Sequence, residues 1–513
     1  MSRISLTCLT LFFCGIAGAK SPNIVFFLVD DLGWSDVGCY GSTFYDTPHI
    51  DALAAEGVRF TDAYATCHVC SPSRASILTG KYPARLHLTD WISGRKDFPF
   101  QSLRQPENRP ALPLEESTLA EILKAHGYAT GHFGKWHLGE NPAGPMQQGF
   151  DLMVPQNWFK GWPKAGYHAP FQLEGLPGEP GDYLTDRLTD EALGFIEESR
   201  DEPFFLYLSH FAVHDPIDGR PDLVKKYEDR LAQIEPPEGP GFILEGNPDD
   251  PDPLTRDELD QLLNRPSHSG FKVLPNRTVK IKQHQDNPQF AAMVEAMDES
   301  LGRVVAKLEE LNLTKNTLVI FTSDNGGMSG GNFGNPKRVV AKDKLDRAFS
   351  TSNLPLRGAK GWLYEGGIRV PAIIKWPGRV AAGTTCDEPV TGTDYFPTVL
   401  EAVGISKRPG TEIDGVSLVH LMEKKSFERG PLFWHFPHYS NHGMQSPGGA
   451  VRDGDFKLIE YFENGSVQLF NLKEDPSENR DLSKEYPEKT RELLTALRQW
   501  RENTGASMPT RKQ

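Results

Sequence analysis

The 513-residue sequence contains no run of 18 consecutive apolar residues and no surplus of basic charge. The first absence argues against a transmembrane helix, which needs about 20 apolar residues in a row. The second argues against nucleic acid as a partner, because 69 acidic residues outnumber 55 basic ones and the formal net charge is −14. An acidic protein that binds an anion must therefore gather its positive charge inside a pocket.

The N-terminus has the pattern of an export signal. Arg3 supplies a positive start, residues 4–17 are mostly apolar, and Ala17-Gly18-Ala19 matches a cleavage site. We therefore predict a signal peptide over residues 1–19 and an exported protein, either periplasmic or secreted.

Cysteine is scarce, with six residues in the chain. Two of them belong to the predicted signal, which leaves Cys39, Cys67, Cys70 and Cys386. An even number in an exported protein favours disulfides. The C-x-x-C spacing of Cys67 and Cys70 also occurs in redox and zinc sites, but no second C-x-x-C pair accompanies it.

Short apolar runs alternate with amphipathic segments along most of the chain. We expect strands at residues 23–29, 203–208, 317–323 and 370–375, and helices at 118–125 and 290–311. This alternation predicts an α/β fold with a mostly parallel sheet covered by helices on both faces. Residues 216–288 are richer in proline, glycine and charge. They are interpreted as an insertion near the active-site mouth, either a lid or a solvated surface loop.

The pattern changes near residue 425. Short predicted strands follow, with hairpin signals at Asp453-Gly454 and Asn464-Gly465, and a helix is expected over 487–503. The sequence thus predicts a catalytic domain over residues 20–424 and a smaller α+β domain, an antiparallel sheet plus a helix, over 425–513.

The strongest motif is CSPSRASILTG, which runs from Cys70 to Gly80. Its proline at +2, arginine at +4 and Leu-Thr-Gly at +8 to +10 match the whole signature of the sulfatases. The chain resembles that family, closest to its arylsulfatase A-like and N-acetylgalactosamine-sulfatase-like branch. The resemblance implies an alkaline-phosphatase-like fold and a maturation enzyme that oxidises Cys70 to formylglycine. The hydrated aldehyde would attack sulfur and later expel sulfate. An ordinary buried cysteine is the alternative.

Two acidic doublets directly follow predicted strands: Asp30-Asp31 and Asp324-Asn325. Carboxylate and amide oxygens favour calcium or magnesium over zinc. Such doublets are also common at helix caps and strand ends. Together with residue 70, which the resemblance implies is also a metal ligand, they match the sulfatase metal site. The resemblance implies that this site holds one calcium ion that orients the sulfate.

Two further blocks match the family, GKWHLG at 134–139 and LRGAKG at 356–361. The resemblance implies that Lys135 and Lys360 contact the sulfate and that His137 acts as a general base. Arg74 would stabilise the formylglycine and balance the metal-bound carboxylates.

The segment SHFAVHDP, residues 209–216, contains two histidines. In the family a histidine shortly before a proline protonates the leaving alcohol. This spacing favours His214, with His210 as the competitor.

The resemblance implies a sulfate ester as the substrate. We expect an exo-acting enzyme on a sulfated carbohydrate of the galactose or N-acetylgalactosamine type. The residues expected to recognise it are Trp158, Trp162, His168 and the segment 434–439 with His435 and His438. Two alternatives stay open. One is a phosphonate or phosphate ester hydrolase of the same superfamily, and the other is a non-catalytic, calcium-dependent binder of sulfated glycans.

Overall fold

The computed structural model describes residues 21–99, 101–246, 254–264, 271–273, 278–330, 339–341, 350–405, 412–442 and 445–512. The predicted signal peptide, residues 1–19, lies outside these ranges. Among the described helices, none combines the length and the apolar character needed to cross a bilayer.

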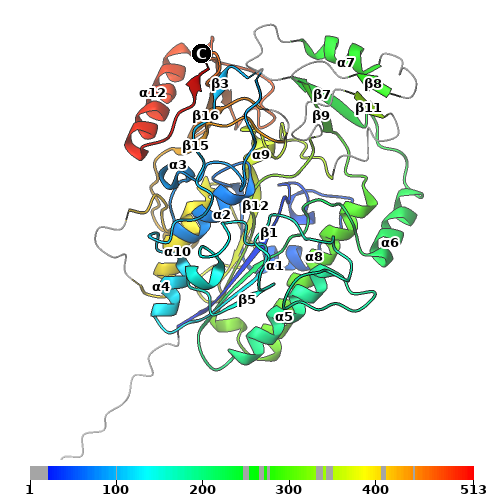
Figure 1. Cartoon of the computed structure of the whole chain (residues 1–513), viewed down its shortest axis with the longest axis vertical. Helices are drawn as coiled ribbons and strands as arrows, with labels where there is room; N and C mark the ends of the chain where they lie inside the picture. The colour runs from blue at the N-terminus through cyan, green and yellow to red at the C-terminus, as the bar shows by residue number, and fades with distance from the viewer. Residues whose placement is uncertain are drawn as a thin grey trace, which may run out of the picture.

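A nine-stranded sheet forms the centre of the protein (Figure 1). Its strand order is β13-β2-β12-β10-β1-β6-β4-β5, and β14 pairs with β2. The strands are β1 (Asn23–Val29), β2 (Val58–Tyr64), β4 (Ala129–Gly134), β5 (Leu152–Val154), β6 (Phe204–Ser209), β10 (Thr317–Ser323), β12 (Arg369–Lys375), β13 (Thr384–Cys386) and β14 (Val390–Thr391). Only β12 runs against its neighbours in this sheet. The predicted mostly parallel α/β class is confirmed.

The central strands are continuous apolar runs because helices cover both faces of the sheet. All seven residues of β1 are buried, and the six from Ile24 to Val29 alternate between two separate apolar layers. One layer contains α1 (Pro48–Glu56), α5 (Leu184–Glu198), α6 (Pro221–Leu231) and α8 (Pro288–Glu310). The other contains α2 (Cys70–Thr79), α4 (Leu119–Ala125), α10 (Tyr395–Ala402) and α11 (Val419–Met422).

Two helices begin where a side chain caps their first turn. Thr118 caps α4 with a capping box, in which its hydroxyl accepts from the Glu121 amide and the Glu121 carboxylate accepts from the Thr118 amide. The Asn287 side chain caps α8, and Pro288 occupies the first turn, where no intrahelical donor is needed.

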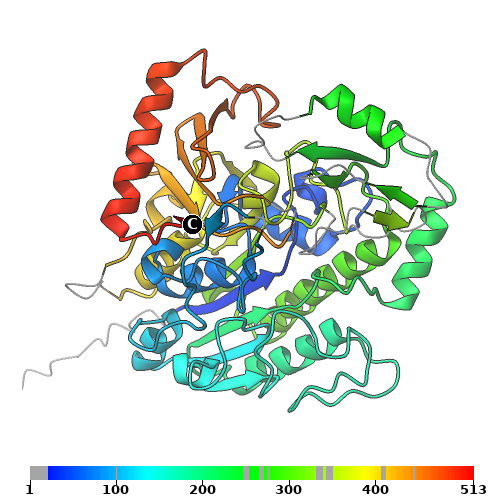
Figure 2. The same ribbon diagram turned by 45° about the horizontal axis from the view of Figure 1, so that its top comes forward.

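The described parts of the predicted insertion contain regular structure (green in Figure 2). Their elements, with one strand from further along the chain, are α6, β7 (Phe242–Gly246), α7 (Arg256–Asn264), β8 (Phe271–Val273), β9 (Thr278–Lys282) and β11 (Val339–Ala341). β7 pairs with β9 and β8 with β11, and all of β9 is buried. The solvated-loop interpretation is therefore wrong for these residues.

A second, antiparallel sheet follows in the chain, as predicted. It consists of β15 (Leu432–Phe436), β16 (Gly448–Asp453), β17 (Phe456–Tyr461) and β18 (Val467–Asn471). Helix α12 (Pro487–Thr504) packs on it through Leu493 and Leu497. On the other face, Trp434 and Ile459 share an apolar cluster with Tyr64 and Trp362 of the larger sheet region. The boundary at residue 425 stays a prediction.

The remaining short elements connect these layers. They are α3 (Pro83–Leu86), α9 (Glu365–Ile368), β3 (Leu103–Arg104) and β19 (Thr510–Arg511). The pairing of β3 with β19 brings the end of the chain back to the loop that follows α3.

Candidate active site

The predicted polar residues gather where the parallel strands end. Asp30 follows β1, Lys135 follows β4 and Asp324 follows β10. The register pairs Val29 with Ser323, so the two acidic doublets leave the sheet side by side. Ligand sites of α/β sheets form at this edge.

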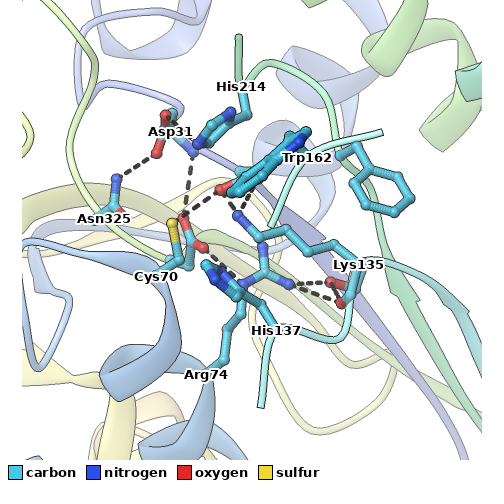
Figure 3. A network of polar contacts seen from close by, with 12 residues as sticks. Asp31, Cys70, Arg74, Lys135, His137, Trp162, His214 and Asn325 are labelled. Carbon is cyan, nitrogen blue, oxygen red and sulfur yellow. Dashed lines mark hydrogen bonds and ion pairs between the residues drawn. The ribbon is translucent and has the colours of Figure 1, made fainter. Parts of the chain in front are cut away.

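Cys70 is the first residue of α2 and is buried beside both doublets (Figure 3). Its Sγ lies 3.5 Å from Asp30 Oδ1 and 3.5 Å from Lys360 Nζ. The N-terminus of a helix carries partial positive charge, which favours negative charge at this position.

Arg74 lies one helical turn after Cys70 and is 1% exposed. Its Nε donates to Asp324 Oδ2 at 2.8 Å, and its Nη1 donates to the Lys135 carbonyl at 3.0 Å and to the Ser209 hydroxyl at 2.5 Å. Arg74 thus links the ends of β10, β4 and β6 beneath the cysteine.

The acidic residues form a group with the spacing of a metal site. One ligand atom from each of Asp30, Asp31, Cys70 and Asp324 lies within 4.8 Å of all the others. The Asn325 amide nitrogen donates to Asp31 at 2.8 Å, which leaves its Oδ1 buried and without a hydrogen-bond partner among the described residues. Such oxygens suit a hard cation such as calcium or magnesium.

Two lysines neutralise part of this acidic group. Lys135 Nζ lies 2.5 Å from Asp30 Oδ2, and Lys360 Nζ lies 2.7 Å from Asp31 Oδ1. Burial, reinforced by Asp324, raises the pKa of Asp30 to about 6 despite Lys135. Burial also acts to raise the pKa of Asp31, but Lys360 and His214 outweigh it and hold that pKa below its usual value.

The Cys70 thiol is a poor nucleophile in this setting. Burial raises its pKa well above the ordinary value, and the nearby lysines do not compensate. Because the thiolate is the reactive form, the unmodified residue stays inert near neutral pH. Cys39, Cys67, Cys70 and Cys386 all lie in the described part of the chain as free thiols, so the predicted disulfides are absent there.

His137 is held as a neutral imidazole with one free lone pair. Its Nε2 lies 2.6 Å from the Ile92 carbonyl, which can only accept, so Nε2 carries the hydrogen. The Nδ1 atom is buried and has no hydrogen-bond partner among the described residues. Burial, with the charge of Lys135, lowers the pKa of His137 well below its ordinary value. This tautomer can accept a proton at Nδ1.

The two competing histidines lie in different places. His214 lines the active-site cleft, with its Nε2 3.7 Å from Asp31 and its Nδ1 2.8 Å from the Asp215 carbonyl. His210 is buried in the opposite direction, where its Nε2 lies 2.9 Å from the Ser300 hydroxyl of α8. The structure therefore brings His214, and not His210, to the site.

The charge environment of His214 favours its protonated form. Burial and Lys360 act to lower its pKa, but Asp31, Asp30 and Asp215 outweigh them and raise it.

A cleft of about 390 Å³ opens above Cys70. Its lining residues come from seven separate segments: Val69, Cys70, Trp91, His137, Trp162, His214, Asp215, Pro216, Lys360, Asn441 and His442.

The structure supports one of the predicted recognition residues and contradicts two. Trp162 lines the cleft and is 43% exposed. His435 and His438 are buried and bond to the Ser507 carbonyl and the Thr89 hydroxyl, so their predicted contact with substrate is wrong. His435 belongs to strand β15 and His438 follows its end by two residues. The chain reaches the cleft lining at Asn441, three residues beyond His438.

Two other predicted recognition residues lie outside the cleft lining. The Trp158 indole donates to the Trp162 carbonyl at 2.7 Å and so supports the loop that carries Trp162. His168 lies 3.3 Å from Asp218. Sequence reasoning also missed the polar and aromatic lining residues Trp91, Asp215, Asn441 and His442. The last two lie just beyond the predicted segment 434–439, in the same aromatic and histidine-rich part of the sequence.

Comparison with known proteins identifies the family. The sequence profile described as Sulfatase matches residues 22–405, and the profile described as N-sulphoglucosamine sulphohydrolase, C-terminal, matches residues 359–503. Human arylsulfatase A is 31% identical, over 94% of this chain and 88% of its own. Mouse N-acetylgalactosamine-6-sulfatase is 30% identical, over 82% of this chain and 70% of its own. The crystal structure of Ps i-CgsB is 26% identical with a TM-score of 0.68, covering 94% of this chain and 93% of that one. The chain therefore belongs to the sulfatase family and is a sulfuric ester hydrolase.

Proposed function

We propose that this sulfatase works with a formylglycine at position 70 and one calcium ion, and that it releases inorganic sulfate from a sulfated carbohydrate. The observation that carries the proposal is the meeting of Cys70, four oxygen-bearing side chains and two lysines in one cluster, of which Cys70 and Lys360 line the cleft. Asp30, Asp31, Asp324 and Asn325 would hold the ion. The orphaned Asn325 Oδ1 fits this assignment, because a buried acceptor without a partner is costly unless a cation or water satisfies it.

The charge of the site supports a sulfate monoester as ligand. Three buried carboxylates face the three cations Arg74, Lys135 and Lys360, so a divalent ion would add two formal positive charges. A sulfate monoester carries one negative charge, so its electrostatic interaction with such a site is favourable. Calcium, when bound, would orient the sulfate oxygens and withdraw charge from sulfur.

The chain's own side chains would supply the remaining steps. Lys360 and Lys135 would hold sulfate oxygens in place beside position 70. His137 Nδ1 would accept a proton during sulfate release, since its Nε2 is already committed to Ile92. His214 Nε2, which lies in the cleft lining 3.7 Å from Asp31, would deliver a proton to the leaving oxygen.

Three observations favour a carbohydrate leaving group. The cleft presents Trp91 and Trp162, whose flat faces can pack on a sugar ring, together with a few polar groups. Its volume of about 390 Å³ suits one terminal residue better than an internal stretch of polymer. Among similar proteins, one is named N-acetylgalactosamine-6-sulfatase, and Ps i-CgsB was solved in complex with k-i-k-neocarrahexaose. We infer an exo-acting enzyme on galactose or N-acetylgalactosamine sulfates.

The test is sulfate release from a panel of defined sulfated mono- and oligosaccharides, measured by ion chromatography. The protein's conversion at position 70 is first checked by mass spectrometry, because expression without the maturation enzyme leaves a thiol. Aryl sulfate, phosphate diester and phosphonate esters form the comparison set. Faster turnover of the phosphorus esters would replace the proposal with the phosphonate or phosphate hydrolase alternative. Binding of sulfated glycan without any sulfate release by converted protein would favour the non-catalytic binder.

Export of the protein is proposed on the pattern of residues 1–19 alone. N-terminal sequencing of protein recovered outside the cytoplasm should begin at Lys20. An uncut Met1 would overturn this proposal.

A further inference from the structure

Asp215 places a carboxylate at the mouth of the cleft. It directly follows His214 and lines the same cleft, and 52% of its side chain is exposed. One of its oxygens lies 3.0 Å from His214 Nδ1. Because half of the side chain stays open to solvent, Asp215 can also face whatever is attached to the scissile sulfate.

The same mouth is lined by a loop of the smaller sheet region that carries Asn441 and His442. This loop is packed tightly beside Lys360. A Cβ atom on Gly361 would lie 2.3 Å from the His442 carbonyl, so only glycine allows the approach. Arg95 Nη1 donates to the Ser440 carbonyl at 2.9 Å and braces the loop from the other side.

Apart from His214 and Lys360, which belong to the sulfate site, the polar groups that line this mouth are neutral or acidic. Burial, together with Lys360, lowers the pKa of His442 to about 3, so its imidazole is uncharged near neutral pH. Asn441 is an amide, and Trp91 and Trp162 are uncharged. Among the described lining residues Lys360 alone is a lysine or arginine, and its ammonium is paired with Asp31 at 2.7 Å in the sulfate site.

We propose that Asp215 makes this enzyme selective for substrates whose scissile sulfate has hydroxyl or amide donors beside it, and against substrates with a second anionic group there. This inference rests on the proposed sulfatase chemistry and adds the chemical class of the leaving group. The carboxylate would accept hydrogen bonds from a neutral sugar ring, whereas a second sulfate or a uronate beside it would be repelled. Asn441 and His442 would complete the polar wall.

The test compares N-acetylgalactosamine 4-sulfate, the 6-sulfate and the 4,6-disulfate. We expect kcat/KM for the disulfate to be at least about tenfold below that of the better monosulfate, and the ratio to shrink as salt rises, because salt screens the repulsion. In Asp215→Asn the ratio should fall to about threefold or less. Asp218→Asn, which removes the same charge three residues away and outside the cleft lining, should leave the ratio unchanged.

Ratios are used because Asp215 also touches His214, so its replacement lowers all rates together. Equal kcat/KM for mono- and disulfated sugar in the wild type would overturn the inference, as would a ratio that Asp215→Asn leaves intact. If that variant does not fold, a wild-type ratio that is insensitive to salt overturns it as well. Failure of the underlying sulfatase proposal looks different, because no substrate, including 4-nitrophenyl sulfate, would then release sulfate.

Discussion

Two largely buried charge clusters in this protein have equal numbers of carboxylates and cations, but only one of them borders the cleft. The catalytic cluster consists of Asp30, Asp31, Asp324, Arg74, Lys135 and Lys360. The interface cluster, where the smaller sheet packs on the larger one, consists of Asp62, Glu365, Glu478, Arg369, Arg452 and Lys457. Each has three carboxylates and three cations, so charge counts do not distinguish an active site from a structural network.

The difference lies in access to the cleft. Lys457 lies 2.9 Å from both Glu365 and Glu478, and Tyr64 donates to Glu365 at 2.7 Å. Glu478 Oε1 nevertheless has no hydrogen-bond partner among the described residues, and no member of the interface cluster lines the cleft. In the catalytic cluster, Arg74 Nη2 has no hydrogen-bond partner among the described residues, and Lys360 lines the cleft. Incomplete pairing beside an open cleft marks the place where a ligand can complete the network.

The largest expected effect is the loss of sulfatase activity when Cys70, but not the nearby Cys67, is replaced. Cys70→Ala should lower sulfate release by about 10⁴-fold or more, because the side chain that becomes the nucleophile is gone. Folding and calcium binding should persist, which circular dichroism and calorimetry can check. Cys67→Ala is the matched control, since Cys67 is equally buried but lacks the signature. Substantial activity in Cys70→Ala would refute the assigned nucleophile.

Removal of the metal should disable the catalytic cluster alone. Exhaustive treatment with a chelator should lower the rate by about 100-fold or more, since several kcal/mol of charge stabilisation depend on the ion. The melting temperature should also fall and recover when calcium is restored, because a ligand that binds only the folded state stabilises it. A metal-free protein, verified by elemental analysis, with unchanged melting and activity would contradict a calcium site.

Replacing one lysine in each cluster by methionine tests the comparison directly. Lys457→Met leaves two buried carboxylates poorly compensated and should cost about 3–5 kcal/mol of stability in denaturant unfolding. Its kcat/KM per folded molecule should stay within about threefold of wild type. Lys360→Met should have the opposite effect. Its stability should change little, whereas its kcat should fall by about 10²–10³-fold. If both variants lose activity equally, the interface cluster is part of the catalytic machinery and the distinction fails.

The smallest effect concerns pH. Burial, reinforced by Glu365, raises the pKa of Glu478 from 4.5 to about 7. The folded state therefore holds this proton more tightly than the unfolded state, so the contribution of Glu478 to stability declines as pH rises from about 4.5 to 7. Glu478→Gln cannot ionise, so its stability relative to wild type should rise across that window by about 1 kcal/mol or more. A difference in melting temperature that does not vary with pH would show that Glu478 is already charged at low pH.

Patterns of consecutive residues predicted the fold well. The strands β1 and β10 and the helices α4 and α8 were expected within two residues of their bounds, because burial on both faces and capping leave local signatures. The antiparallel direction of β12 and the regular structure between residues 221 and 282 were not predicted. Strand direction depends on which distant segment is the neighbour, and the polar composition of this region hides the buried strand β9.

Recognition of substrate shows the limit most clearly. The aromatic and histidine-rich string near residue 435 suggested a contact with the pocket, yet His435 and His438 are packed inside and Asn441 and His442 line the cleft. Which of these residues line the cleft depends on where strand β15 ends. The composition of the segment does not encode that position.

The sequence by itself determined the family, the layered α/β architecture and the set of residues that could carry the chemistry, because contiguous motifs and strand periodicity are local properties. The tertiary structure alone decided which of His210 and His214 reaches the site, which of two equal charge clusters borders a cleft, and that Asp215 stands at its mouth. These outcomes depend on the direction in which a side chain leaves its backbone and on what packs against it, and both are set by contacts between segments far apart in the chain.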